Sequence, residues 1–586
     1  MRNSLIVVVF FLMYFPINTY GKIINVRTQR DFDCLPEQLA SVIKAGGTDN
    51  NILVKFSSGI FVSKERQILL GWMQAPNKRI RIVGENTVII PDGEVYQHGD
   101  KYHSLFSYDN SLMCENKDVP IWTTCHEAVG LVEVLNSKTK ECRLKPKEAL
   151  PFQSDYSNAY ILIPEWCQTG VYKITGIKGG YIYFTADNLQ ISYNNGYVVN
   201  DDYNYGGKNI RYKLCNICKN DDLFRIENGK VCLPEEIKIV REGRISNYIT
   251  IQSSSFKSIE ISGIEFRGNK YVDSRPAIFV CDTKCESITI RDCKFIGMHG
   301  TVISIESTDN VNVTNNKFTD CHYYGVYSDN RCKGTIISSN TFTNMGKRMT
   351  CSFCITCKGE DYYVANNKLS NFGYGGIGIG VWHGHKQYRP SKGVVENNEL
   401  FYTEDYLTDV SDKCIMDGGA IYLWTKNDGA IIRNNYIHDI SGVMDNRGIF
   451  CDDGARNYVI EHNVITNIYN SYCIDSRRVA RLETQIGPTN VNNVIRDNII
   501  NGKIRFVGRE GTDNECEYGT NYYLVSKGGD MPLRNVENTI VSGEDIKLIY
   551  TGTKKGRVGL DSKSYTRLKK TPVWKYVKRR VARKNK

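Results

Sequence analysis

Five aspartates gather within 58 residues of the chain, each beside a short apolar run: Asp417, Asp445, Asp452, Asp453 and Asp475. Hydrolysis of a glycosidic bond needs two carboxyl groups, one protonated to assist the leaving oxygen and one ionised to attack the sugar or activate water. Like charge and partial burial separate the pKa values of such a pair. An Asp before Gly is also common turn chemistry, so the clustering, and not any single Asp, indicates glycoside hydrolysis.

Aromatic and polar residues accompany these aspartates. Side chains alternate along a strand, so if Ile421 and Leu423 face inward, Tyr422 and Trp424 face outward. Phe450 and Asp452 then face outward from the following coil, and the flat faces of the rings suit sugar rings. An exposed turn His and packed Trp side chains are the structural alternatives. The predicted substrate-binding residues are Trp382, His383, Tyr422, Trp424, Asp445, Asp475 and Arg477.

A short phrase with Asn in its second position recurs along the chain, at intervals of 24 to 37 residues. Repeats of this length with variable insertions are typical of a solenoid. Short strands separated by Asn and Gly turns, without helical periodicity, favour one β-coil per repeat. Asn tolerates the left-handed backbone of a tight corner, and its amides can bond between neighbouring coils. The second residues of the phrases are Asn316, Asn340, Asn367, Asn398, Asn435, Asn463 and Asn498.

The Asn-rich coils resemble those of right-handed parallel β-helix proteins, the pectin-lyase-like superfamily, from about Val26 to Phe506. The resemblance extends to fucosidase- and xylanase-type glycosidases of this fold, which carry similar "DGG" and "GI(Y/F)xDDG" motifs on adjacent coils. Here the motifs are residues 417–419 and 448–454. The resemblance implies an all-β, right-handed parallel β-helix, and a catalytic pair made of Asp417 with Asp452 or Asp453. It leaves open which is the acid and which the base or nucleophile.

The pattern divides the chain into six parts. A signal peptide is expected over residues 1–21, because Arg2 precedes an apolar run that is too short to span a bilayer. A helix over Cys34–Gly46 is expected to cap the first coils, and a β-rich subdomain is expected where the repeat fades. The predicted parts are 1–21 signal peptide, 22–98 cap and first coils, 99–241 inserted subdomain, 242–511 main coils, 512–560 C-terminal portion and 561–586 basic tail.

Two other functions fit the same strip. A polysaccharide lyase would need a basic residue near a uronate, with the acids as Ca²⁺ ligands; we rank it second because no Lys or Arg is expected in the strip of Asp417. A non-catalytic sugar-binding adhesin is the third class. No cofactor is expected, apart from Ca²⁺ in the lyase, and the expected partner is a polysaccharide or oligosaccharide bound by a monomer.

Charge and cysteine content bear on location. The net charge is +11, but residues 561–586 alone carry +10, from 11 Lys or Arg and one Asp. The tail is a solvated end or a contact for an acidic polymer or membrane surface, and the body suggests no nucleic-acid recognition. With the signal peptide, the 20 Cys favour a secreted, periplasmic or cell-surface protein in which some cysteines pair. Zinc binding by Cys215-x-x-Cys218 or Cys351-x-x-Cys354-x-x-Cys357 is the weaker interpretation.

Overall fold

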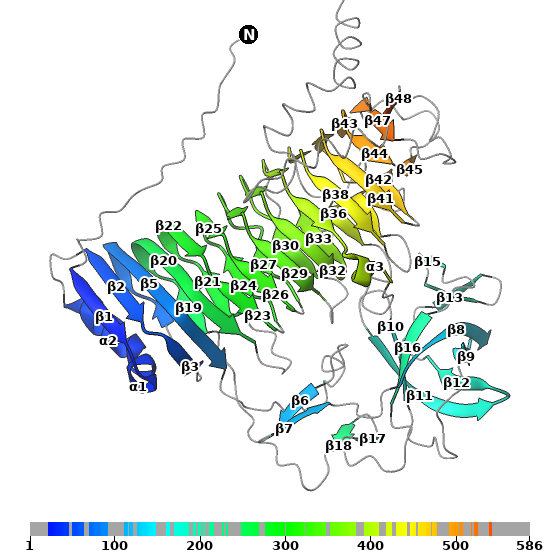
Figure 1. Ribbon diagram of the computed structural model, residues 1–586, viewed down its shortest axis with the longest axis horizontal. Helices are drawn as coiled ribbons and strands as arrows, with labels where there is room; N and C mark the ends of the chain where they lie inside the picture. Colours follow the sequence, from blue (N-terminus) through cyan, green and yellow to red (C-terminus); the bar gives the residue numbers. More distant parts are fainter. Residues whose placement is uncertain are drawn as a thin grey trace, which may run out of the picture.

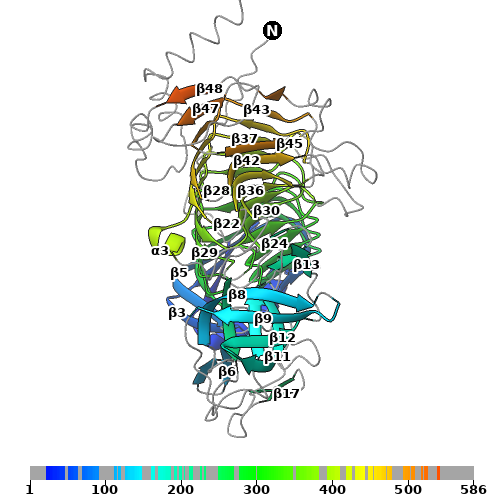
Figure 2. The same ribbon diagram turned by 90° about the vertical axis from the view of Figure 1, so that its right-hand side faces the viewer.

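The computed structural model shows a long right-handed parallel β-helix with a smaller β-rich insert beside it (Figures 1 and 2). Described residues of the β-helix are 21–45, 50–63, 69–91, 248–268, 276–298, 300–321, 323–346, 352–381, 392–408, 418–424, 429–441, 446–452, 455–469, 471–477, 492–501, 503–507, 517–518, 521–524 and 538–541. Those of the insert are 111–114, 117–120, 126–136, 138–147, 160–164, 169–186, 191–194, 197–200, 203–204, 210–215, 225–227 and 230–232.

Each coil contributes strands to three parallel ladders, and successive coils pair in register. The first ladder contains β1 (Lys22–Val26), β2 (Asn51–Phe56), β5 (Gln74–Pro91), β20 (Ser255–Arg267), β22 (Lys284–Arg291), β25 (Val311–Thr314), β28 (Ile336–Ser338), β31 (Tyr363–Ala365), β34 (Val394–Glu396), β37 (Ile431–Arg433), β40 (Val459–Glu461), β43 (Val494–Arg496) and β46 (Glu517–Tyr518).

The second ladder shares the long strands β5 and β20 with the first. Its other strands are β3 (Gly59–Ser63), β23 (Lys294–Ile296), β26 (Lys317–Thr319), β29 (Thr341–Met345), β32 (Lys368–Phe372), β35 (Glu399–Phe401), β38 (Tyr436–Ile440), β41 (Val464–Ile468), β44 (Ile499–Asn501), β47 (Asn521–Leu524) and β48 (Asn538–Val541).

The third ladder is a separate eleven-stranded sheet. It contains β4 (Leu69–Gly71), β19 (Ile249–Gln252), β21 (Ile278–Cys281), β24 (Ile303–Glu306), β27 (Val326–Ser328), β30 (Phe353–Cys357), β33 (Gly375–Ile379), β36 (Gly419–Leu423), β39 (Arg447–Cys451), β42 (Tyr472–Arg477) and β45 (Lys503–Val507). A short helix, α3 (Glu404–Thr408), lies in the connection between β35 and β36. The expected β-helix is therefore confirmed.

The core fills the inside of the coils. Inward residues at the same place in successive coils stack on one another, because one coil cannot bury its apolar face alone. Phe266, Phe295, Phe318 and Phe342 are nearly parallel, with neighbouring ring centroids 5.1, 4.9 and 4.3 Å apart. None of these rings is exposed. The repeat in the sequence thus becomes a continuous apolar column.

Two short helices lie at the β1 end of the coils (Figure 1). α1 (Gln29–Asp33) starts at a capping box, in which Thr28 and Asp31 satisfy each other's backbone N–H groups. α2 (Leu35–Lys44) falls within the helix expected over residues 34–46. Leu35 and Leu39 of α2 are buried in the β-helix core, so the helix packs its apolar side onto the first coils.

The Asn phrase has two positions with different roles. The second residue is buried and forms a ladder: Nδ2 of Asn398 donates to Oδ1 of Asn435 at 2.9 Å, and Nδ2 of Asn367 donates to Oδ1 of Asn398 at 3.0 Å. The left-handed backbone belongs instead to the first residue, for example Asn397 with φ 56°. Both roles were predicted for one Asn, whereas the structure divides them between two consecutive residues. Other residue types also adopt the left-handed backbone at this corner, namely Ser339, His462 and Asp497.

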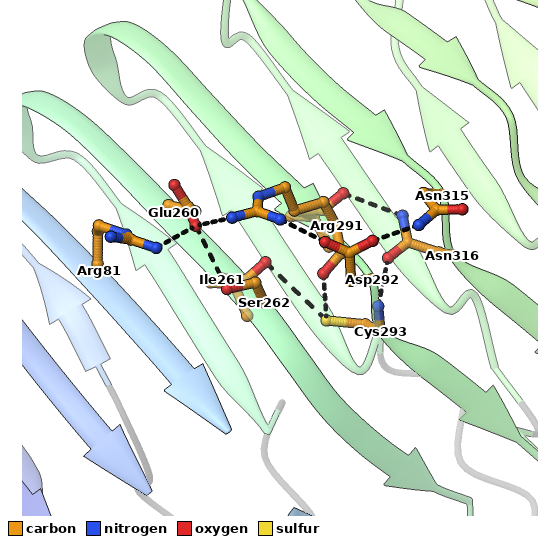
Figure 3. Close-up of polar contacts among 10 residues, drawn as sticks. Arg81, Glu260, Ile261, Ser262, Arg291, Asp292, Cys293, Asn315 and Asn316 are labelled. Atoms are coloured by element: carbon orange, nitrogen blue, oxygen red, sulfur yellow. Dashed lines mark hydrogen bonds and ion pairs between the residues drawn. The ribbon is translucent and has the colours of Figure 1, made fainter. Parts of the chain in front are cut away.

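The row of buried residues that forms the Asn ladder begins one coil earlier than the Asn pattern predicts, with a Cys (Figure 3). Asp292 occupies the left-handed corner with φ 54°, and Cys293 occupies the buried ladder position. The backbone N–H of Cys293 donates to Oδ1 of Asn316 at 2.9 Å. Beside it on the outer surface, Glu260 accepts from Arg81 at 3.2 Å and from Arg291 at 2.8 Å, which links three coils.

The insert enters the β-helix between β5 and β19. Its β8 (His126–Asn136), β9 (Glu141–Pro146), β10 (Tyr160–Pro164), β11 (Thr169–Lys178), β12 (Tyr181–Thr185) and β16 (Ile210–Cys215) pair antiparallel in the closed circuit β8–β16–β10–β11–β12–β9–β8. This closure is a six-stranded barrel. The remaining strands are β6 (Ser111–Cys114), β7 (Lys117–Pro120), β13 (Ile191–Asn194), β14 (Tyr197–Asn200), β15 (Tyr203–Asn204), β17 (Arg225–Glu227) and β18 (Lys230–Cys232).

The described cysteine side chains test the prediction that some cysteines form disulfides. Of the 20 cysteines, 14 lie in the described ranges, and the 11 whose side chains are described form no disulfide. The predicted pairing is therefore not found in this part of the chain. Cys354 and Cys357, from the predicted metal-like motif, have no exposed surface and belong to the β-helix core. Burial raises the pKa of both thiols, which keeps them protonated as small apolar side chains.

Candidate functional site

The outward side of the third ladder carries the candidate site. Ile421 and Leu423 lie in the β-helix core, whereas Tyr422 lies in a separate apolar cluster, as the strand alternation predicts. This outer aromatic cluster consists of buried Phe353, Tyr374, Tyr422 and Phe450, with Tyr324 and Trp424 partly buried against it. It spans the strands β30 to β39, so an apolar platform lies outside the solenoid as well as within it.

The residues that directly follow the strands of the third ladder are aligned in a row from coil to coil, because the strand ends pair in register. The paired strand ends Ser328, Cys357, Ile379, Leu423 and Cys451 are in register from coil to coil. The residues that follow them are Asp329, Lys358, Gly380, Trp424 and Asp452, which we call the outer row. Because adjacent coils lie about 4.8 Å apart, Lys358 and Asp452 are separated by roughly 14 Å across three coils. Trp424 lies between them.

Asp452 is held from the neighbouring coil. The Tyr422 hydroxyl donates a hydrogen bond to Oδ2 of Asp452, and the Tyr374 hydroxyl donates to the Tyr422 oxygen at 3.4 Å. Asp452 remains partly exposed while Tyr422 is buried. The Tyr422 hydroxyl therefore orients the Asp452 carboxylate. The Tyr422 ring is buried, so it is not a stacking surface for a ligand.

Gly378 in β33 leaves room for the Trp424 ring. A Cβ on Gly378 would lie 3.1 Å from side-chain atoms of both Phe353 and Trp424, which is tighter than ordinary contact. The absent side chain lets these rings approach across the strand, with centroids 5.2 Å apart. Trp424 packs one part of its ring on the cluster and keeps another part exposed. Such an amphipathic ring can contact the apolar face of a pyranose.

Lys358 is the basic residue of the outer row. Its Nζ lies 4.9 Å from the ring centroid of Tyr327 and 5.7 Å from that of Trp424. It donates to the Tyr327 hydroxyl at 3.3 Å. Burial lowers the pKa of Lys358, against the nearby negative charge of Asp329. Burial also raises the pKa of Tyr327 to about 12, with Asp329 and Glu306 adding to the effect.

From the sequence, no Lys or Arg is expected in the strip of Asp417, which lies outside the described residues, but the row of Trp424 and Asp452 contains Lys358. The sequence carried a signal for it. Aligning "FCITCKG" with "GGIGIGV" on adjacent coils places Lys358 opposite Gly380. The strand register, which decides that alignment, was missing from the sequence analysis.

Asp475 has a different position from the one predicted. Its Oδ2 accepts from Nε of Arg447 at 2.6 Å, and both side chains are completely buried. The Arg447 guanidinium also lies 3.8 Å from the ring centroid of Phe450. In place of the predicted contact with substrate, the structure gives Asp475 a buried ion pair beneath the outer aromatic cluster.

Six predicted site residues have no described side chain. Arg477 ends β42, and its side chain is not described. Five predicted site residues lie outside the described residues: Asp417, Asp445, Asp453, Trp382 and His383. Within the described ranges, no three His, Cys, Asp or Glu side chains converge as metal ligands. No helix in those ranges is long and apolar enough to cross a membrane.

Comparison with known proteins identifies the family. A model of the right-handed β-helix region matches residues 177–369 and 301–523, which together span more than half of the chain. The chain therefore belongs to this family of right-handed β-helix proteins. A search of curated proteins found no match.

Solved structures share the fold at low sequence identity. A glycoside hydrolase is 10% identical with a TM-score of 0.46, and the alignment covers 94% of this chain and 98% of that chain. The A-module of an Azotobacter vinelandii mannuronan C-5 epimerase is 11% identical with a TM-score of 0.43, covering 88% and 94%. A PL6 family alginate lyase is 10% identical with a TM-score of 0.36, covering 89% and 53%. These similarities concern the fold alone.

Proposed function

We propose that the protein is a carbohydrate-active enzyme, a glycoside hydrolase that cleaves a polysaccharide or oligosaccharide on the outer row of the third ladder. One observation carries the proposal. The Asp452 carboxylate, oriented by Tyr422, follows Trp424 in the same outward row on the adjacent coil. A positioned carboxyl group beside a partly exposed ring is the minimum that sugar binding and bond cleavage require.

In this proposal Asp452 is one of the two carboxyl groups. The second is Asp417 or Asp453, as the motif resemblance implies, and both lie outside the described residues. One carboxyl donates a proton to the glycosidic oxygen, and the other attacks the sugar or activates water. Trp424 holds the sugar ring, so that the scissile bond is kept at a fixed place along the outer row.

The test compares wild type with Asp452→Asn, Asp417→Asn and Asp453→Asn on a panel of polysaccharides. Reducing-sugar release and the absorbance of unsaturated uronates are followed together. Asp361→Asn is the matched control, because Asp361 is an exposed residue of the turn between β30 and β31 and pairs with Lys333. Sugar release without the absorbance, lost with Asp452→Asn and with one other site variant, is the expected result. Binding of sugars by wild type without any cleavage would replace the hydrolase with the adhesin.

A polysaccharide lyase is the second candidate, and Lys358 favours it. Elimination needs a base to abstract the proton alpha to a uronate carboxylate, and a lysine whose pKa is lowered by burial is suited to that role. An absorbance signal that disappears with both Lys358→Gln and Lys358→Arg would assign the lyase. Its dependence on added Ca²⁺ would show that the acids bind the cation.

A further inference from the structure

Lys358 has no carboxylate partner among the described residues, in contrast to three other lysines on the surface of the β-helix. Lys294, Lys333 and Lys368 each lie within 4 Å of a Glu or Asp oxygen; Lys368, for example, is 3.4 Å from Glu399. Among the described residues, no carboxylate lies within ion-pair distance of Lys358. Asp329, the neighbour in its row, is instead paired with Arg331 at 2.7 Å.

The surroundings of Lys358 make an unpaired charge costly. The side chain is partly buried between the rings of Tyr327 and Trp424, and the Tyr327 hydroxyl is its described hydrogen-bond acceptor. An ammonium group has three donors, so two remain for another acceptor. A partly desolvated cation gains more from an added anion than an exposed one does, because water screens the attraction less.

The position of the ammonium group relative to Trp424 indicates which anion fits. The Nζ atom lies 5.7 Å from the centroid of the ring that stacks a sugar in the proposed function. A carboxylate or sulfate carried by that sugar, or by its neighbour, would reach Nζ while the pyranose remains on Trp424. A free small anion would lack the stacking contact, and a neutral sugar would leave the ammonium unpaired.

We propose that the substrate is an acidic glycan, whose uronate carboxylate or sulfate ester pairs with Lys358 while its ring packs on Trp424. This inference rests on the proposed function of the same face and names the class of sugar that this face accepts. Lys358 is here a specificity-determining cation, and its role requires a retained positive charge. A base role would instead require that it lose its proton, so the two roles predict different behaviour of an Arg variant.

The test measures binding by titration calorimetry and needs no turnover. The probes are oligosaccharides of galacturonate, mannuronate and sulfated galactan, each beside its carboxyl-reduced or desulfated counterpart. We expect wild type to bind at least one acidic probe about tenfold or more tightly than its neutral counterpart, which corresponds to about 1.4 kcal/mol. Lys358→Gln should abolish the preference and Lys358→Arg should retain it. The arm that shows the preference identifies the anion as carboxylate or sulfate.

Lys368→Gln is the matched control. Lys368 also lies over an aromatic ring, 5.0 Å from the centroid of Phe401, but it has Glu399 as partner and belongs to the second ladder. The Lys368→Gln variant should leave the preference for the acidic probe unchanged. Equal affinity for every acidic and neutral pair, no binding of any acidic probe, or a preference that survives in Lys358→Gln would each overturn the inference. Acidic preference without cleavage would reject only the hydrolase, and cleavage of neutral glycans without acidic preference would reject only the inference.

Discussion

Arg447 and Asp475 form an ion pair across adjacent coils, with Nε and Oδ2 at 2.6 Å and neither side chain exposed. The pair lies beneath Phe450, on the outward side of the third ladder. Removing one member of a buried pair takes away a partner of the other buried charge, and this costs more than the pair itself contributes.

Asp475→Ala should therefore lower the free energy of unfolding by about 3–5 kcal/mol, measured by urea denaturation. The double variant Arg447→Met, Asp475→Leu should recover most of that loss, because neither buried charge remains. Asp361→Asn, which removes an exposed charge paired with Lys333, should change the free energy by less than about 1 kcal/mol. A loss with Asp475→Ala no larger than in this control would show that the pair is not buried in solution.

Tyr422→Phe should loosen Asp452 while keeping the ring that packs in the outer aromatic cluster. We expect kcat/KM to fall roughly tenfold, because one hydrogen bond to a charged group is lost in the transition state. Tyr363→Phe is a matched control: it removes a similar bond, from Tyr363 to Glu396 at 2.7 Å, on the first ladder. Equal activity losses in the two variants would contradict a positioning role for Tyr422.

Asn398→Ala removes an inner rung of the Asn ladder. Nδ2 of Asn398 donates to Oδ1 of Asn435 and to the Val364 carbonyl, and Oδ1 accepts from the backbone and side chain of Asn367. The variant should lose about 2–4 kcal/mol of unfolding free energy, since several buried groups lose partners. Asn397→Gly, at the adjacent left-handed corner, should cost less than about 1 kcal/mol because Gly adopts that backbone freely. Similar losses at both positions would refute the division of roles.

His438 should make stability depend on pH. Burial lowers the pKa of His438, but the hydrogen bond between Nδ1 and Asp439 and the charge of Glu399, 3.6 Å from Nε2, outweigh it, and the net pKa is raised from 6.5. A raised pKa contributes stability that is complete below about pH 6.5 and is lost as pH rises through the folded-state pKa. The pKa values of Asp439 and Glu399 are lowered despite burial, partly by His438, so their contribution is lost as pH falls below about 4.5.

The unfolding free energy of wild type minus that of His438→Gln should therefore be larger at about pH 5.5 than at about pH 9. His462 provides a control of opposite sign, because burial lowers its pKa and its neutral form is favoured in the folded state. For His462→Asn the difference should shrink as pH falls below about 6.5. A difference for His438→Gln that is independent of pH would show that the ion pairs do not form.

The sequence alone determined the coil and its repeat. Inward Phe and Ile residues and the buried Asn at regular places are dictated locally, since each coil meets the same neighbour above and below. The alternation that places Tyr422 and Trp424 outside and Leu423 inside follows from the two-residue period of a strand. These features were predictable because they depend on short segments and on identical contacts between coils.

Tertiary structure decided which residues of distant coils share the outer row. The register between β30, β33, β36 and β39 brings Lys358 into line with Trp424 and Asp452, although 94 residues separate Lys358 from Asp452 in the chain. It also buries Asp475 against Arg447, which a pattern of outward positions could not reveal. Connections of unequal length hide the register from the sequence, because hydrogen bonds between coils, and not spacing along the chain, align one strand with the next.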